Sequence, residues 1–402
     1  MPKVWFRVAL LNFLIAAIMG VILRYAFVEE LPWLKFRFFL HGHSHVAMLG
    51  WVYLALYALL MGAFLPEAQQ QAPFYRSVFL VSQFAVIGML ITFPIQGYAP
   101  LPIAFSTLHG LASYCFTWRF WKDTRRQRGL PLQFVKAALL FMLFSTLALW
   151  AMPPIVLLGY QHKAIYYMTV QFYLHFQFNG WFAFAVLGLF FQLLESRNIH
   201  ISLRLARPFF RLLAVSAFFT YALAVAWAEP LPIVFAANSL GVTLQLAAMV
   251  LFALLVAGSH RELHQQLGGW GFLLIKIAFA CFALKVLMQA AVVIPYIATV
   301  AYTIRNFVIG FIHLVLLGVI TQFILGYAAL NGVLNLRSRL SRLGLGLLLA
   351  GFLGSELLLF LQGAMFWGAM GFLPFYYEAL FGVSTLMPVG VGVLVVRNRI
   401  TV

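Results

Sequence analysis

Six of the ten histidines fall inside apolar stretches of the sequence, where imidazole rings are uncommon. These six are His41, His43, His45, His109, His175 and His313. A polar ring surrounded by lipid costs free energy unless it is hydrogen-bonded, paired or bound to a metal. Neutral imidazole is also the commonest metal ligand among the side chains. Metal chemistry is therefore the first possibility that these positions raise.

Four of the histidines are expected at a common depth in the membrane. His45, His109, His175 and His313 each come roughly eight to ten residues after the outer end of an expected helix, which is about 12 to 15 Å at the α-helical rise. All four helices run from the outer face inward. A lone membrane histidine is most often a hydrogen-bonded core residue, whereas a coplanar set indicates a metal or haem plane.

Three of these histidines open similar segments, HVAMLGW at His45, HFQFNGW at His175 and HLVLLGV at His313. The separations are 130 and 138 residues. Each segment has a glycine five residues after the histidine, at Gly50, Gly180 and Gly318. The repeat predicts three blocks of four helices in an internally symmetric bundle. A missing side chain would let a flat macrocycle or another helix approach the backbone.

The composition identifies the class of protein that must position these residues. Of 402 residues, 64% are hydrophobic and 9% are charged, against about a quarter charged in soluble domains. This rules out a soluble enzyme, and the same apolar excess excludes the nucleic-acid binder that a net charge of +17 would otherwise suggest. The sequence predicts a polytopic membrane protein.

The chain divides into twelve runs long enough to cross a bilayer, for which about 20 apolar residues are needed. The predicted fold is a single all-α transmembrane domain, residues 1–402, of twelve helices with pseudo-threefold symmetry. The two cysteines, Cys115 and Cys281, lie in apolar runs and offer no disulfide framework. The expected spans are 5–27, 36–64, 76–97, 101–121, 132–158, 165–194, 208–228, 232–257, 270–296, 304–330, 342–362 and 370–396.

The basic residues orient this bundle. With the N-terminus inside, 20 of the 26 Lys and Arg residues fall on inner segments and one, Lys285, lies within a helix. The positive-inside bias then predicts a multi-pass protein of the cytoplasmic membrane with both termini cytoplasmic. The outer segments hold only Arg24, Lys35, Arg37, Lys163 and Arg305.

The segment HGHSH carries more than one candidate ligand. His41 and His45 are four residues apart and share a helix face, whereas His43 points about 200° away from His41 and is expected to face the outer interface. Lys35 and Arg37 precede them near the outer surface. With Arg305, these cations could neutralise haem propionates, or they could simply extend to the interface.

Further polar side chains are expected inside the spans. They could form a proton or water path, although interhelical hydrogen bonds for packing are a commoner use. Lys285 needs a partner or a cavity, and Glu356 is the nearest acidic candidate. The set comprises Gln171, Gln177, Asn179, Asn238, Ser239, Gln245, Lys285, Gln289 and Glu356.

The segments HGHSHVAMLGW, FYLHFQFNGW and FVIGFIHLVLLG resemble those of the haem-copper oxidase superfamily, that is, subunit I of cytochrome c and quinol oxidases and of related nitric oxide reductases. The resemblance implies twelve helices with pseudo-threefold symmetry. It also implies that His45 or His41 and, opposite it, His313 are the axial ligands of a low-spin haem, most simply b-type because no CXXCH motif is present. His175 matches a copper ligand of that family.

The chain departs from the family at the catalytic metals. Phe311 stands where the family has its high-spin haem ligand, and the expected helix over 208–228 has no histidine pair for copper. Asn179 stands where the main oxidases have a tyrosine, and His109 has no counterpart. His109 is either a core residue or part of a different metal site with His175 and His41. Copper or another second metal therefore remains open.

These observations predict a haem-binding redox protein of the membrane whose minimum activity is electron transfer. Whether it is an enzyme is open. One alternative is an active oxygen or nitric oxide reductase with an atypical metal site at His175, and another is a twelve-helix secondary transporter. The expected partners are the lipid bilayer, a quinol or cytochrome c electron donor and an additional small redox subunit, with no nucleic acid.

Overall fold

The computed structural model describes residues 1–226 and 228–398 of the chain, and every regular element within them is a helix. Six helices begin with a proline in their first turn, where its missing N–H costs nothing; they are α1, α5, α6, α7, α13 and α16. The all-α prediction is confirmed for the described residues. The chain forms two compact units, residues 1–126 with 324–402 and residues 127–323.

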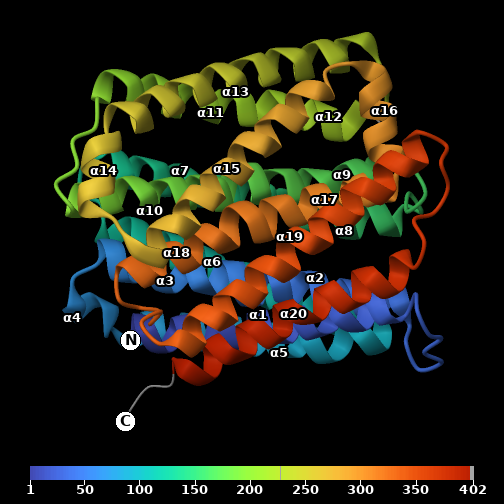
Figure 1. Ribbon diagram of the computed structural model, residues 1–402, viewed down its shortest axis with the longest axis horizontal. Coiled ribbons are helices and arrows are strands. Elements are labelled where there is room, and N and C mark those ends of the chain that lie inside the picture. The colour runs from blue at the N-terminus through green and yellow to red at the C-terminus, as the bar shows by residue number, and fades with distance from the viewer. Residues whose placement is uncertain (227, 399–402) are drawn as a thin grey trace. The chain divides into compact units, whose positions relative to one another are not determined.

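The first unit is built from the two ends of the chain. The C-terminal helix α20 packs along α1, as Figure 1 shows in red and blue. The helices of this unit are α1 (Pro2–Tyr25), α2 (Phe36–His45), η1 (Val46–Tyr53), α3 (Leu54–Phe64), α4 (Glu67–Gln70), α5 (Pro73–Gln96), α6 (Pro100–Asp123), α19 (Arg339–Trp367) and α20 (Tyr376–Arg397). Helix α18 (Gln322–Leu330) begins at the boundary between the units.

The second unit is continuous in sequence. Two of its long helices are interrupted by a single residue, at Thr146 and at Thr220. Its helices are α7 (Leu130–Ser145), α8 (Leu147–Leu157), α9 (Ala164–His175), η2 (Phe176–Phe182), α10 (Ala183–Ser196), α11 (Leu203–Phe219), α12 (Tyr221–Ala226), α13 (Pro232–Gly258), α14 (His260–Gln266), α15 (Gly269–Ala291), α16 (Pro295–Thr303), α17 (Arg305–His313) and η3 (Leu314–Thr321).

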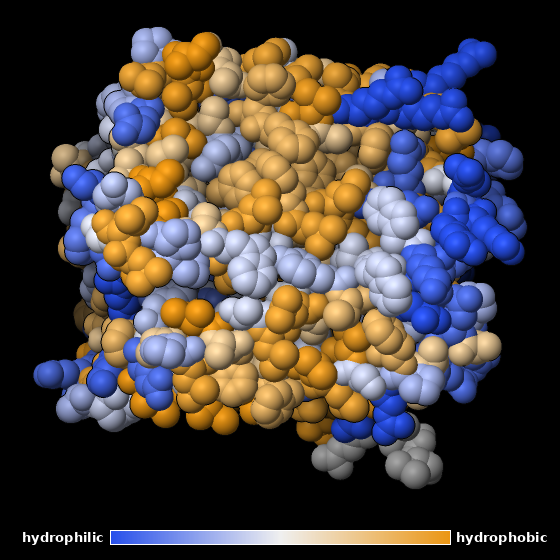
Figure 2. All heavy atoms as spheres, turned by 180° about the vertical axis from the view of Figure 1, so that it is seen from behind, coloured by the Kyte–Doolittle hydropathy of each residue, from blue (hydrophilic) through white to orange (hydrophobic). Residues whose placement is uncertain are grey.

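Eleven helices among the described residues are long and apolar enough to cross a membrane. Each matches one of the expected spans, with ends that differ by at most six residues. The twelfth expected span, 101–121, corresponds to α6, which is 24 residues long but is not among those eleven. Figure 2 shows broad areas of apolar side chains, as a lipid-facing surface requires, with many hydrophilic residues gathered at one edge of the view.

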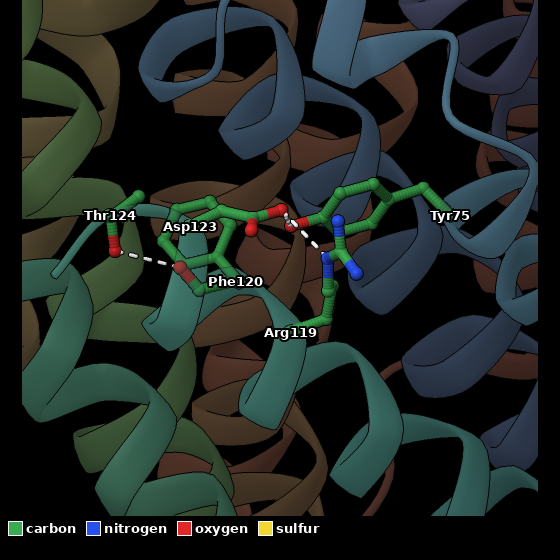
Figure 3. A network of polar contacts seen from close by, with 5 residues as sticks. All are labelled: Tyr75, Arg119, Phe120, Asp123 and Thr124. Carbon is green, nitrogen blue, oxygen red and sulfur yellow. Dashed lines mark hydrogen bonds and ion pairs between the residues drawn. The ribbon is translucent and has the colours of Figure 1, made fainter.

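A small polar network joins the start of α5 to the end of α6 (Figure 3). Asp123, near the end of α6, accepts hydrogen bonds from the Tyr75 hydroxyl of α5 and from Arg119 Nε, both at 2.9 Å. Thr124 Oγ1 donates to the Phe120 carbonyl at 2.7 Å and closes the last turn. The end of α6 thus meets the start of α5, so the two helices are antiparallel neighbours.

The pair α19 and α20 is packed backbone to backbone through glycines. A Cβ atom at Gly344 would lie 2.9 Å from the Gly390 carbonyl oxygen, and one at Gly390 would meet the Gly344 carbonyl and lie 2.7 Å from Leu348 N. Small residues at such crossings let membrane helices gain van der Waals contact that larger side chains would prevent.

Candidate functional site

The structure places the predicted site residues in two separate units. His41, His45 and His109 belong to the first unit, and His175 and His313 to the second. Within its own helix each of the four histidines lies near the expected position. His45, His109, His175 and His313 come nine, nine, eleven and eight residues after the first residue of α2, α6, α9 and α17, respectively.

A π-helical segment follows directly after three of the histidines. His45, His175 and His313 are the last α-helical residues before η1, η2 and η3. Such wide turns are rare and occur often at functional sites. Each contains the glycine noted in the sequence repeat, at Gly50, Gly180 or Gly318. The local repeat in the sequence is therefore also a local repeat in the backbone.

The three helices with these segments are also the most buried spans. In their most apolar stretches 78% of the residues of Phe36–Phe64, 83% of Ala164–Ser196 and 61% of Arg305–Leu330 are buried, against 50% or less in the other eight spans. An apolar helix that is mostly buried packs against other helices over most of its surface. The three histidine helices are thus the most covered spans, and a ligand beside them would be shielded from lipid.

His45 is held in an orientation that leaves one ring nitrogen free to bind a metal. Its Nδ1 lies 2.9 Å from the backbone carbonyl oxygen of His41. A carbonyl only accepts hydrogen bonds, so Nδ1 carries the proton and the lone pair is on Nε2. A hydrogen bond from the other ring nitrogen to a carbonyl is the usual support of a metal-binding histidine. The ring also stacks on Phe93 at 4.3 Å.

His41 shares the helix face of His45, as the spacing predicted. Both rings contact Tyr98, at centroid distances of 4.6 Å and 6.2 Å. His43 points away from them, also as predicted, but it does not face the outer interface. Its Nδ1 lies 2.9 Å from the Ala16 carbonyl oxygen of α1, so the ring links α2 to α1. That part of the prediction was wrong because a partner helix covers this face.

His109 is a buried histidine beside the same face. It is 3% exposed, its ring contacts Tyr53 edge-on at 4.6 Å, and it lies near enough to His45 to interact electrostatically. Its Nε2 has no hydrogen-bond partner among the described residues. His41, His45 and His109 therefore gather in the first unit, while the predicted combination with His175 would join residues of different units.

His175 has both ring nitrogens engaged. Its Nε2 lies 2.7 Å from the Ala217 carbonyl oxygen, and Asn179 Nδ2 lies 3.3 Å from its Nδ1. Nε2 must donate to the carbonyl, so Nδ1 accepts from the amide. The Ala217 carbonyl is available because α11 ends at Phe219, which removes the next helical donor. A metal at His175 would have to displace one of these bonds.

We expect His175→Ala to destabilise the protein by about 1 to 3 kcal/mol, because the buried Ala217 carbonyl would lose its donor. The measurement is thermal unfolding of the purified protein in detergent. The control is His200→Ala, whose side chain is 92% exposed and whose loss should change stability little. Weaker copper binding in His175→Ala, with unchanged stability, would instead identify His175 as a metal ligand.

The predicted cations lie at the N-terminal ends of α2 and α17. Lys35 precedes α2 with its Nζ 5.6 Å from the Phe38 ring, and both Lys35 and Arg37 are exposed. Arg305 begins α17 and is also exposed. His313, at the other end of α17, is partly buried. Exposed guanidinium and ammonium groups at these ends fit either predicted role, propionate binding or an interfacial anchor.

Two of the repeat glycines serve close packing of protein groups. A Cβ atom at Gly50 would lie 2.9 Å from Val86 Cγ1, and one at Gly180 would lie 2.5 Å from Phe141 Cβ. The Gly50 carbonyl also accepts from Asn12 Nδ2 of α1 at 3.1 Å, and Asn12 pairs with Gln83 of α5 at 2.7 Å. At these two positions the absence of a side chain lets a neighbouring helix, α5 at Gly50 and α7 at Gly180, pack closely.

Glu356 has a charged neighbour within the first unit. It is 7% exposed on α19 and lies near enough to Arg24, at the end of α1, to interact electrostatically. Arg24, which the sequence analysis assigned to an outer segment, thus compensates the charge of the buried Glu356.

No group of three or more His, Cys, Asp or Glu side chains that could hold a metal ion occurs within residues 1–226 and 228–398. A bis-histidine haem needs only two axial side-chain ligands, so it does not require a group of three. In comparisons with known proteins, neither a protein-family model nor a curated protein matches the chain.

Proposed function

We propose that this chain is a haem-binding membrane redox protein whose minimum activity is electron transfer, with His45 and His313 as axial ligands of a low-spin b-type haem. The observation that carries the proposal is the state of His45, whose Nδ1 proton is fixed on the His41 carbonyl and whose Nε2 is left as the donor atom. The π-helix after His45 recurs after His313, as it does after His175, so the two proposed ligands have the same local backbone setting.

The protein would supply orientation and burial, and the haem would supply the one-electron chemistry. His45 is oriented by the His41 carbonyl and by Phe93. The outer cations Lys35, Arg37 and Arg305 would neutralise the propionates. Charge compensation and ligand type are the main means by which a protein sets a haem potential.

The proposal includes a topology of twelve spans in three blocks of four. Helix α6 would be the twelfth, because its 24 residues are about 36 Å long and it is antiparallel to α5. Both termini would be cytoplasmic in the cytoplasmic membrane, as the count of 20 inner against five outer cations favours. A quinol or cytochrome c would donate electrons, and a small redox subunit would be an additional partner.

The test is an absorption spectrum of protein purified after haem-replete expression. We expect the sharp reduced-state band of a low-spin b-type haem, and a colourless protein would refute the proposal. Carbon monoxide then tests for catalysis of oxygen or nitric oxide reduction, because only an iron with an open position should shift its spectrum. The engaged nitrogens of His175 favour no shift.

A secondary transporter is the second candidate, and the interrupted helices of the second unit favour it. The breaks at Thr146 and Thr220 release backbone groups inside spans, as in the discontinuous helices that bind transporter substrates. Here the released Ala217 carbonyl is taken by His175 rather than left available. A colourless protein that still folds would make this the leading function.

A further inference from the structure

The second unit contains a buried cation that the proposed haem site does not use. Lys285 lies inside the span formed by α15 and is 4% exposed. Its Nζ lies 5.9 Å from the centre of the Phe282 ring, and among the described residues no group accepts a hydrogen bond from it. A lysine at this depth requires compensation by another group.

Carboxylates of the same unit do not supply that compensation. Residues 127–323 contain three acidic residues, and each lies outside the middle of a span. Glu195 is at the inner end of α10, Glu229 is in the connection before α13, and Glu262 binds the His200 backbone N–H in the connection after α13. The negative partner of Lys285 must therefore come from elsewhere.

The packing of three helices locates the surroundings of Lys285. The rings of Phe190 on α10, Phe252 on α13 and Phe279 on α15 meet one another at centroid distances of 4.7 to 5.9 Å. Because the short α14 joins α13 to α15, these two helices run in opposite directions. Moving outward from the aromatic cluster means decreasing residue numbers on α13 and increasing numbers on α15.

About two helical turns further out, polar side chains replace the aromatic ones between α13 and α15. Gln245 precedes Phe252 by seven residues on the same face of α13. Lys285 follows Phe282, whose ring meets Phe252 at 6.5 Å, by three residues on the same face of α15. Gln245 lies about 10 Å beyond Phe252, and Lys285, six residues after Phe279, lies about 9 Å beyond that residue. Gln289 and Asn238 come next on the same faces. Gln245, Gln289 and Asn238 are 4%, 5% and 1% exposed. We call Asn238, Gln245, Lys285 and Gln289 the outer polar cluster.

The amide groups of the outer polar cluster are not satisfied by the protein. Gln245 Oε1, Gln289 Oε1 and both amide atoms of Asn238 are buried and have no hydrogen-bond partner among the described residues. A buried polar group that makes no hydrogen bond is destabilising, so water or a ligand is expected to bind there. His175, on another helix, lies near enough to Lys285 to interact with it electrostatically.

We propose that the outer polar cluster binds one small monovalent anion of about the size of chloride. The ammonium of Lys285 supplies the charge, and water bridges the anion to the buried amide oxygens of Gln245 and Gln289. The anion removes the uncompensated charge that Lys285 would otherwise bring into the membrane. The site is independent of the haem and of His45 and His313.

The experiment is equilibrium dialysis of the purified full chain in detergent against radiolabelled chloride, with gluconate as the balancing anion. We expect one saturable chloride per chain. Lys285→Met should weaken binding at least tenfold. Lys276→Met should leave it unchanged, because this lysine is on the same helix but exposed, with its Nζ 5.1 Å from the Phe272 ring. Gln245→Leu should weaken binding severalfold, because its buried amide oxygen is at the depth of Lys285.

Wild-type protein should also gain thermal stability as chloride replaces gluconate, because a ligand that binds only the folded state raises the unfolding temperature. This measurement keeps the proposal testable if Lys285→Met does not fold. Absence of saturable chloride binding to folded wild-type protein would refute the anion site, as would equal binding by Lys285→Met. Either result leaves the haem proposal untouched, because that is read from the absorption spectrum.

Discussion

We expect the replacement of His45 by alanine to remove the low-spin haem band of the proposed haem from the reduced spectrum, and the replacement of His313 by alanine to do the same. A bis-histidine haem loses its low-spin character when either axial ligand is lost, and an unligated macrocycle is released on purification. We expect the haem content per chain to fall at least tenfold in both variants. The measurement is the reduced-minus-oxidised spectrum, normalised to protein.

The matched controls are the neighbouring histidines. His41→Ala should retain the band because His45 Nδ1 is bonded to the backbone carbonyl of residue 41, which the substitution leaves in place. His43→Ala should also retain it, because His43 contacts α1 rather than the His45 face. Loss of the band in His41→Ala with retention in His45→Ala would assign the ligand to His41 and contradict our choice.

Gly390→Leu destabilises the protein by about 3 kcal/mol or more, because the new side chain meets backbone that has no alternative position. A Cβ atom at residue 390 lies 2.7 Å from Leu348 N and even closer to the Gly344 carbonyl oxygen. Only a separation of α19 from α20 would relieve the overlap. The measurement is the unfolding temperature of the purified protein in detergent.

Gly382→Leu is the matched control for this experiment. Gly382 lies on the same helix, and nothing lies within 4 Å of a Cβ atom built there. The two variants therefore share the change in helix propensity, but only the side chain at residue 390 collides with the backbone of α19. Equal unfolding temperatures for the two would show that α19 and α20 do not pack through these glycines.

The helices could be predicted from the sequence because their signals are local. The apolar runs and their interruptions by charged or proline-rich segments gave helix ends within a few residues of those observed. Helix α6 also has the predicted ends, but polar side chains such as His109 and Ser113 make it less apolar, and it is not among the eleven helices apolar enough to cross a membrane. For that helix, length and pairing with α5 are more informative than apolarity.

The environment of each histidine could not be predicted, because it depends on residues distant in sequence. Nothing near His175 indicates that its ring donates to Ala217, 42 residues later, or that His43 binds the Ala16 carbonyl. The π-helices were also missed. Their only trace in the sequence was the glycine five residues after each histidine, which suggested close approach and not a wider turn.

The assembly of the first unit from both ends of the chain has a consequence for biosynthesis. At about 5 to 20 residues per second, α19 and α20 leave the ribosome several seconds after the last residue of the second unit. The second unit, residues 127–323, can therefore fold during translation. Until α20 arrives, the surface of α1 that will contact it is open to lipid or to an insertion chaperone. A nascent chain truncated before α19 should thus contain a folded second unit and an incomplete first unit.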